Sequence, residues 1–368
     1  MKLSSFAGPL ALGASLFVSS TTSTAVPRQS SSQPWSIKNF NSLITFGDSY
    51  TDESRLGYFI THNGSAPPAG TLLPETFAAP GGGRTWSRYV VQYTGATVQG
   101  KWTPQMTLWF PAIDAFFPSV LEYEVPAFVA DIPATRVNST PAVQLFTPKL
   151  TAQDSVYALW IGTNDLGVYT FLTDSQVPGK VLSDYTDCIY SVFDKLYASG
   201  GRHFVLMNTV PLNLAPLYAN DSLHGIGANQ YWANKTANHT EIAYTMQQFT
   251  TTVNNVFKYQ TPYELLVANR YPGAHFALFD THSLITDIYN SPAKYLNGTG
   301  VVKGGECVWG YENHCTVDQK TCVKRQNGTN PDGYLWFDEL HPSEQTDRII
   351  ARNFVQVLNG TSQYATYY

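Results

Sequence analysis

Three short polar clusters, far apart in the chain, carry residue types that can do acyl-transfer chemistry. Ser49 follows the apolar run 43–46, which is typical of a buried strand. A serine at the end of such a strand presents its hydroxyl at the edge of the sheet. Such a serine can act as a nucleophile, and its backbone N–H can help to hold a developing oxyanion. The alternative is a helix N-cap. Thr51 stands where the nucleophile elbow of the α/β-hydrolases has its second glycine, which excludes that elbow.

The second cluster has Asp338 three residues before His341, near the other end of the chain. At this spacing the carboxylate can accept a hydrogen bond from the imidazole Nδ1–H, which leaves Nε2 free to take a proton from a serine. Asp338 could instead cap the helix predicted over 344–358. Ser343 is the better N-cap for that helix, so the pair is free for chemistry.

The third cluster places Asn164 just after the apolar run 156–161. Its side-chain amide could donate to an oxyanion at the same sheet edge. An Asx turn is the structural alternative.

These clusters, in this order along the chain, resemble the motifs of the GDSL or SGNH hydrolase superfamily. Five segments resemble its secreted fungal members, similar to the acetylesterases of carbohydrate esterase family 16: residues 46–52, 82–86, 123–128, 160–165 and 208–212. The resemblance implies that Ser49 is the nucleophile, His341 the base and Asp338 its orienting partner. It also implies oxyanion donors in the Ser49 N–H and the Asn164 side chain, with no metal and no organic cofactor.

A further motif of the superfamily, a glycine after the second strand that gives a third oxyanion donor, has no convincing match here. We see no apolar strand after Gly95, and Gly100 is the only glycine available for the role. Either residues 97–116 come from a wrongly assembled gene, or the protein has lost a donor, which typically costs about 10²–10³ in rate. We favour the first interpretation because the pattern resumes cleanly at position 117.

The clusters converge only if one sheet carries them. The apolar runs 43–46, 156–161, 203–207 and 275–279 are typical of buried strands, and apolar spacings of three and four predict helices over 86–93, 189–196, 242–257 and 344–358. This alternation predicts an α/β fold with a parallel sheet covered on both faces. The resemblance implies a flavodoxin-like three-layer α/β/α sandwich with strand order 2-1-3-4-5, in which the second strand lies at an edge. We expect a single domain over 26–368, with 62–83 as a surface loop.

The composition excludes some classes of protein. Only 13% of the 368 residues are charged, the net charge is −5, and no long basic run occurs, which excludes nucleic-acid binding. Hydrophobic residues make up 43% and aromatic residues 14%, which excludes a mainly disordered chain. We expect most of the aromatic side chains in the core.

The N-terminus predicts secretion. A signal peptide is predicted over 1–25, from Lys2, the apolar stretch 6–18 and the small residues up to position 25. The apolar stretch is too short to span a bilayer, which argues against a membrane anchor. Residues 26–36 predict a loose mature N-terminus. We expect a soluble, monomeric protein with no integral membrane segment. Its glycosylation sequons are Asn63, Asn138, Asn220, Asn234, Asn238, Asn297, Asn327 and Asn359.

The four cysteines fit an oxidising compartment. Cys307, Cys315 and Cys322 lie close together and are expected to form a disulfide, with the pairing left open. His314 beside Cys315 could suggest a metal site, but no Cys-x-x-Cys pair supports one, so we expect none. Cys188 lies far away in the sequence.

The catalytic clusters and the signal peptide predict a secreted serine esterase, and the family resemblance implies that it removes acetyl or other short acyl groups from carbohydrates. Its substrate would be a small-molecule or oligosaccharide ester. Two alternatives stay open: a lipase or phospholipase of the same superfamily, and a weakly active glycan-binding protein on the same scaffold. The second is suggested by the altered glycine motif and the abundant aromatic residues, which could stack on sugars.

Overall fold

The computed structural model describes residues 35, 37, 39–102, 109–110, 115–116, 118–297, 311–324 and 330–368. These residues belong to one unit, Pro34–Tyr368. The predicted signal peptide over 1–25 lies outside the described residues. Within the described ranges, no helix combines the length and the hydropathy needed to cross a membrane.

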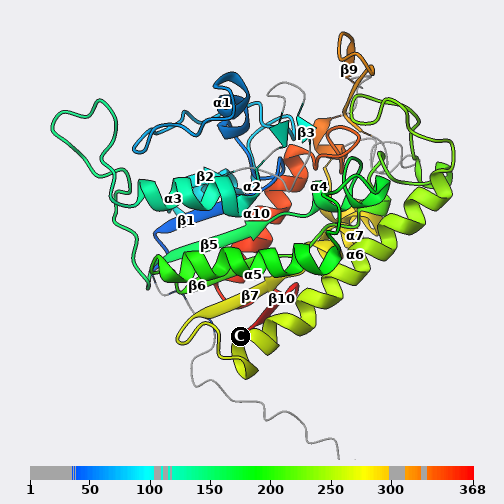
Figure 1. Cartoon of the computed structure of the whole chain (residues 1–368). Helices are drawn as coiled ribbons and strands as arrows, with labels where there is room; N and C mark the ends of the chain where they lie inside the picture. Colours follow the sequence, from blue (N-terminus) through cyan, green and yellow to red (C-terminus); the bar gives the residue numbers. More distant parts are fainter. Residues whose placement is uncertain are drawn as a thin grey trace, which may run out of the picture. The chain divides into compact units, whose positions relative to one another are not determined.

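A six-stranded sheet forms the centre of the fold, in the order β10-β7-β6-β5-β1-β2 (Figure 1). Neighbouring strands pair in parallel except for β10, which pairs antiparallel with β7. The parallel strands, taken in chain order, have the predicted arrangement 2-1-3-4-5, which confirms the flavodoxin-like fold. Their bounds are β1 Ser42–Gly47, β2 Thr97–Trp102, β5 Ser155–Trp160, β6 His203–Met207, β7 His275–Phe279 and β10 Ala365–Tyr367.

The inner strands follow from their apolar runs. Every residue of β1, β5 and β6 is buried, as is all of β7 after its first residue. Parallel strands covered on both faces need apolar side chains on both faces, so they appear as continuous runs in the sequence. All four predicted runs became strands, each within one residue of its expected ends.

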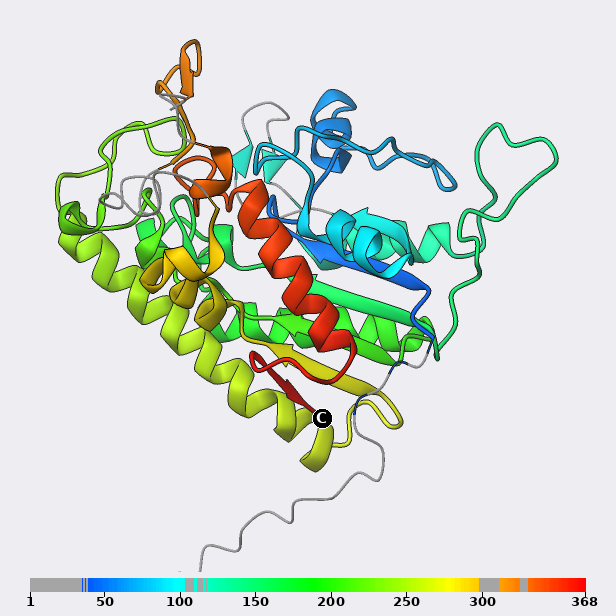
Figure 2. The ribbon, with the colours of Figure 1, turned by 180° about the vertical axis from the view of Figure 1, so that it is seen from behind.

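Helices cover both faces of this sheet. Helices α3 and α5 lie on one face, whereas α2 and α10 lie on the other (Figures 1 and 2). Helix α10 begins after Ser343, whose hydroxyl accepts a hydrogen bond from the Thr346 N–H at 3.2 Å, the predicted cap. The helices are α1 Arg55–Thr61, α2 Trp86–Thr94, α3 Val125–Asp131, α4 Thr163–Leu166, α5 Leu182–Ala198, α6 His239–Pro262, α7 Thr281–Asn290, α8 Pro292–Tyr295 and α10 Glu344–Leu358.

Shorter elements lie in the connections. The residues between α1 and α2 contain no regular element, as predicted for the 62–83 loop. Single helical turns are η1 Val120–Glu124, η2 Phe171–Thr173, η3 Leu212–Leu214, η4 Asp221–Leu223, η5 Tyr263–Val267 and η6 Pro331–Gly333. Two small hairpins pair β3 Trp109–Phe110 with β4 Ala115–Phe116, and β8 Asn313–Cys315 with β9 Cys322–Lys324.

The second strand corrects one sequence-based expectation. We saw no strand after Gly95, yet β2 pairs in parallel with β1 at the edge of the sheet, with a register shift opposite Leu43 to Thr45. An edge strand has a neighbour on one side only and needs no continuous apolar run, so the pattern that finds inner strands misses it.

Most of the aromatic side chains that the structure describes are buried or pack against the core, as expected. The exposed ones are Phe77, Tyr93, Tyr169, Tyr244, Tyr259 and Tyr263. Five tryptophans have described side chains, and all five are buried: Trp35, Trp86, Trp160, Trp232 and Trp336. Trp35, the one described residue of the segment 26–36, is not loose, because its ring packs against His203 and Tyr367; the rest of that segment lies outside the described residues. The described tryptophans therefore leave no flat indole surface for stacking on sugars.

Cys315 and Cys322 form a disulfide that closes the β8–β9 hairpin, which decides the pairing that the sequence left open. Cys188 is a free thiol on α5, and Cys307 lies outside the described residues. Seven sequon asparagines are described. Six are exposed and therefore accessible for glycosylation, whereas Asn220 is half-buried and its side chain accepts the Leu223 N–H.

Candidate active site

The carboxyl edge of the sheet brings the predicted residues together. Ser49 lies two residues after β1, and Asn164 lies in α4, directly after the adjacent strand β5. Asp338 and His341 lie in the loop that precedes α10. Ligand and catalytic sites of open parallel sheets form at this edge, so the topology explains why residues almost 300 positions apart meet.

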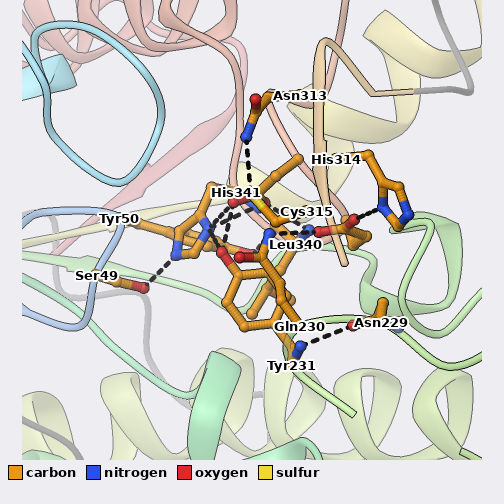
Figure 3. A network of polar contacts seen from close by, with 12 residues as sticks. Ser49, Tyr50, Asn229, Gln230, Tyr231, Asn313, His314, Cys315, Leu340 and His341 are labelled. Carbon is orange, nitrogen blue, oxygen red and sulfur yellow. Dashed lines mark hydrogen bonds and ion pairs between the residues drawn. The ribbon is translucent and has the colours of Figure 1, made fainter. Parts of the chain in front are cut away.

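Ser49, His341 and Asp338 form a continuous hydrogen-bonded chain. The Nε2 of His341 lies 2.7 Å from the Ser49 Oγ, and its Nδ1 lies 2.9 and 3.0 Å from the two carboxylate oxygens of Asp338. Figure 3 shows the Ser49 hydroxyl and the His341 ring directed toward each other. This is the arrangement in which an imidazole takes a proton from a serine while a carboxylate fixes its tautomer.

All three side chains are buried, with exposed fractions of 8% for Ser49, 5% for His341 and 3% for Asp338. Burial opposes ionisation of both titratable groups, yet their mutual attraction outweighs it. The pKa of Asp338 is lowered by the charge of His341 and by hydrogen bonds from His341 and Tyr231, although burial acts to raise it. Burial likewise acts to lower the pKa of His341, but Asp338 raises it above its ordinary value.

Backbone groups hold Asp338 in place. Its Oδ1 accepts hydrogen bonds from the N–H groups of Leu340 at 2.9 Å and His341 at 2.7 Å. The three-residue spacing folds into a tight turn around the carboxylate, as predicted. The capping alternative for Asp338 is wrong, because α10 is capped by Ser343.

Asn164 offers an unused donor at this edge. Its Nδ2 is buried and has no hydrogen-bond partner in the described part of the chain. A buried amide without a partner costs free energy, so such a group calls for an explanation. A substrate oxygen arriving beside Ser49 would supply the missing acceptor.

Gly100 lies inside β2, whose last residue, Trp102, pairs with Phe46 of β1. The other candidate donors follow the ends of their strands, whereas Gly100 precedes the end of its own. Residues 103–108, which follow β2, lie outside the described residues. The role of Gly100 as a third oxyanion donor stays a prediction.

The turn that carries Ser49 is held by buried carboxyl groups. Asp48 accepts hydrogen bonds from the N–H groups of Tyr50 at 3.1 Å and Thr163 at 3.3 Å. Burial raises the pKa of Asp48 to about 6, although those bonds and the charge of His341 lower it.

On the other side of this turn, Glu124 accepts the Gly47 N–H at 3.2 Å. Glu124 is fully buried, and burial raises its pKa well above the ordinary value. The segment 123–128, which the sequence indicated only through the family resemblance, thus supports the turn that carries Ser49.

His314 contacts an acidic partner. Its Nδ1 pairs with Oε1 of Glu339, and Gln230 donates to the other oxygen of that carboxylate at 3.0 Å. Among the described residues, no group of histidine, cysteine and acidic side chains is arranged to hold a metal ion. The pairing ties the disulfide hairpin to the loop that carries Asp338 and His341.

Sequence reasoning missed two tyrosines in the site. The hydroxyl of Tyr231 donates to Asp338 Oδ2 at 2.6 Å, and that of Tyr50 donates to the Leu340 carbonyl at 2.8 Å. Tyr50 could have been suspected because it follows Ser49. Tyr231 lies 110 residues from His341, in a polar loop with no motif of its own, so nothing in the sequence pointed to it.

Known proteins resemble the chain over most of its length. The model of the GDSL-like lipase/acylhydrolase family matches residues 43–354. An acetylesterase from Hypocrea jecorina is 42% identical over 338 residues, covering 90% of this chain and 92% of that protein. An acetylesterase from Thermothelomyces thermophilus is 22% identical over 338 residues, with coverage of 87% and 88%. A solved structure of a mutant acetyl-xylooligosaccharide esterase from Geobacillus Stearmophilus has 16% identity and a TM-score of 0.39, covering 88% of this chain and 95% of that one.

The chain therefore belongs to the GDSL-like lipase/acylhydrolase family, which confirms the resemblance noted in the sequence. It is a carboxylic ester hydrolase of the acetylesterase-like kind.

Proposed function

We propose that this protein is a secreted serine esterase that removes acetyl or other short acyl groups from carbohydrates through an acyl-enzyme on Ser49. One observation carries the mechanism: the hydrogen-bonded chain from Ser49 Oγ through His341 to Asp338. The acyl group is inferred from the fungal acetylesterase that is 42% identical to the chain. The carbohydrate part of the substrate is inferred from the sequence resemblance.

In the first half of the reaction, Ser49 Oγ attacks the ester carbonyl while its proton passes to His341 Nε2. The charge of Asp338 stabilises the imidazolium that forms. The negative charge on the carbonyl oxygen is held by the Ser49 N–H and the Asn164 Nδ2. When the tetrahedral intermediate collapses, His341 returns the proton to the leaving alcohol and the acyl group stays on Ser49.

In the second half, water attacks the acyl-enzyme. His341 takes a proton from the water, and the same donors hold the second oxyanion. Collapse of this intermediate breaks the bond to Ser49 Oγ, which takes the proton back from His341, and the carboxylic acid is released.

The test compares the wild type with Ser49→Ala on 4-nitrophenyl acetate. We expect a fall of at least about 10³-fold in kcat, because the nucleophile is lost. Ser199→Ala is the matched control. Ser199 lies at the end of α5, where its hydroxyl donates to the Lys195 carbonyl and to no other group in the described ranges, so its removal should leave the rate unchanged. Equal rates for wild type and Ser49→Ala would exclude the proposed nucleophile.

Acyl specificity needs its own measurement. Rates on 4-nitrophenyl esters from acetate to dodecanoate should fall steeply with chain length. Faster hydrolysis of the long-chain esters would favour the lipase alternative. Release of acetate from acetylated xylo-oligosaccharides, compared with 4-nitrophenyl acetate, would then test whether a carbohydrate is the preferred leaving group.

Secretion rests on the predicted signal peptide over 1–25 and is supported by the exposure of six sequon asparagines. N-terminal sequencing of protein from the culture medium should begin near Val26. Treatment with an endoglycosidase should increase its electrophoretic mobility.

The missing glycine motif calls for a separate test, because β2 forms up to Trp102 but the residues after it lie outside the described ranges. Sequencing the transcript across codons 95–118 would decide between a wrongly assembled gene and a lost donor. An unchanged sequence would favour the lost donor.

A further inference from the structure

A tight turn over residues 229–232 lies against the loop that holds the candidate catalytic acid and base. Two consecutive side chains of the turn bind two consecutive carboxylates of the loop. Gln230 Nε2 donates to Glu339 Oε2 at 3.0 Å, and the Tyr231 hydroxyl donates to Asp338 Oδ2 at 2.6 Å. The loop therefore has a partner that is specific for both of its acidic side chains.

The turn itself is firmly held. Asn229 and Trp232 exchange two backbone hydrogen bonds, both of 3.2 Å. The fully buried side chain of Asn229 accepts the Tyr231 N–H at 2.9 Å and donates to the Gly227 carbonyl at 2.9 Å. Trp232 is buried in the core. The Tyr231 hydroxyl is thus presented from a rigid support rather than from a mobile loop.

The Tyr231 hydroxyl binds Oδ2 of Asp338, the carboxylate oxygen that accepts no backbone hydrogen bond. Two N–H groups bind Oδ1, as described above, whereas Oδ2 receives the Tyr231 hydroxyl and the His341 Nδ1–H. Apart from His341, Tyr231 is the one side chain in the described ranges that bonds to this carboxylate. Its oxygen also lies 3.3 Å from His341 Nδ1, and its ring packs edge-on against the imidazole, as Figure 3 shows.

We propose that Tyr231 is a positioning residue that acts through Asp338: its hydroxyl shares Oδ2 with the His341 Nδ1–H and thereby weakens the pull of that carboxylate on the imidazolium. The inference rests on the proposed function, because it assigns Tyr231 to the same serine, histidine and aspartate. A shared carboxylate oxygen is a weaker acceptor for Nδ1–H than an unshared one. His341 is then neutral, and able to accept the Ser49 proton, at a lower pH than Asp338 alone would allow.

The sign of the expected pH effect separates this role from a merely structural one. The groups that face His341 are Asp338 and Glu339 from its own loop, Asp48, Ser49 and Tyr50 from the nucleophile turn, and Tyr231. Removing the Tyr231 hydroxyl leaves the other groups in place and returns the full charge of Oδ2 to His341, so the pKa of His341 rises. If the hydroxyl served only to hold the loop in place, its loss would loosen the pairing of Asp338 with His341. The pKa of His341 would then fall, because Asp338 is the group that raises it.

The experiment measures kcat, KM and the pH dependence of kcat/KM on 4-nitrophenyl acetate for the wild type, Tyr231→Phe and Tyr190→Phe. Tyr190 is a matched buried tyrosine on α5 whose hydroxyl contacts Thr261. For Tyr231→Phe we expect kcat/KM well below the acid limb to fall about threefold, because more of His341 is protonated there, with the plateau kcat and KM within roughly twofold of the wild type. We expect the acid limb of the profile to move up by roughly half a pH unit. Tyr190→Phe should change neither quantity.

Other outcomes would overturn the inference. An acid limb that moves down, or a lower rate with an unmoved limb, would assign Tyr231 a structural role only. Urea unfolding of each variant identifies a rate loss that comes from a smaller folded fraction, which would also count against the proposal. Including Ser49→Ala in the series distinguishes failure of the Tyr231 role from failure of the proposed function. If Ser49→Ala is inactive while Tyr231→Phe matches the wild type, only the role of Tyr231 fails; an active Ser49→Ala removes the proposed mechanism itself.

Discussion

Asp48 accepts a hydrogen bond from the backbone N–H of Thr163, across 115 positions of the sequence. Asp48 precedes the candidate nucleophile Ser49, and Thr163 precedes the candidate oxyanion donor Asn164. One buried carboxyl group therefore sets the spacing between the atom that would attack the ester and the amide that would stabilise the product of that attack. Small changes in such spacing weaken catalysis strongly.

The buried Asp48 should leave a signature in the pH dependence of stability. Its pKa in the folded protein is about 6, above the ordinary 3.8, so the folded state binds a proton that the unfolded state releases between these values. This group therefore adds stability as the pH falls from 6 toward 4, up to about 3 kcal/mol at 1.36 kcal/mol per pKa unit. Urea unfolding from pH 4.5 to 7.5 should show that the free energy of unfolding of the wild type increases relative to that of Asp48→Asn as the pH falls. A difference that does not change with pH would contradict the raised pKa.

Asn164→Ala should separate activity from stability. Because Nδ2 has no partner in the described part of the chain, its loss should change the free energy of unfolding by less than about 1 kcal/mol. Loss of an oxyanion donor should lower kcat by about 10²–10³-fold, with little change in KM.

Asn208→Ala is the matched control. Asn208 directly follows strand β6, which pairs with β5, the strand that precedes Asn164. Its Nδ2 donates to Asp280 at 2.8 Å and its Oδ1 accepts the His282 N–H at 2.9 Å. We expect this variant to lose roughly 1–3 kcal/mol of stability. Equal effects of the two substitutions on kcat would argue against Asn164 as a donor.

The activity should fall on acidification through a pKa above 6.5, the ordinary value for histidine. His341 must be neutral to accept the Ser49 proton, and its pKa is raised in the folded protein: burial acts downward, but Asp338 outweighs it, with smaller upward effects of Asp48 and Glu339. In Asp338→Asn the main upward effect is lost. The acid limb of kcat/KM should then move to lower pH while the maximal rate falls roughly 10³–10⁴-fold. An acid limb that stays in place would mean that another group controls it.

Gly47 at the end of β1 should tolerate no side chain. Its φ is +152°, and a Cβ there would lie 2.0 Å from the Trp160 carbonyl oxygen of the paired strand β5. Because that oxygen belongs to the backbone, it has no room to move aside, and Gly47→Ala should lose roughly 3 kcal/mol or more along with the activity. Gly57→Ala, inside α1 with open space around it, should be neutral or stabilising by about 0.5–1 kcal/mol. Thermal unfolding of both variants checks the contrast.

Much of this fold could be predicted from local patterns. The inner strands appear as continuous apolar runs because both of their faces are buried, and the helices over 86–94 and 344–358 have an apolar period because one face is buried. The edge strand β2 was missed because a strand with one neighbour does not need that pattern. The disulfide partners were confined to three cysteines, but the choice of Cys315 with Cys322 depends on which side chains the hairpin brings opposite each other.

The sequence by itself determined the kind of chemistry. Ser49, Asn164, Asp338 and His341 stand at the ends of elements whose type can be read locally, and the parallel sheet places those ends at one edge. Only the tertiary structure decided what supports them: Thr163 on Asp48, Glu124 behind Gly47, and Tyr231 on Asp338. These contacts join residues 77 to 115 positions apart. A hydrogen bond requires two atoms to meet within about 3 Å, and local sequence periodicity carries no information about such distant meetings.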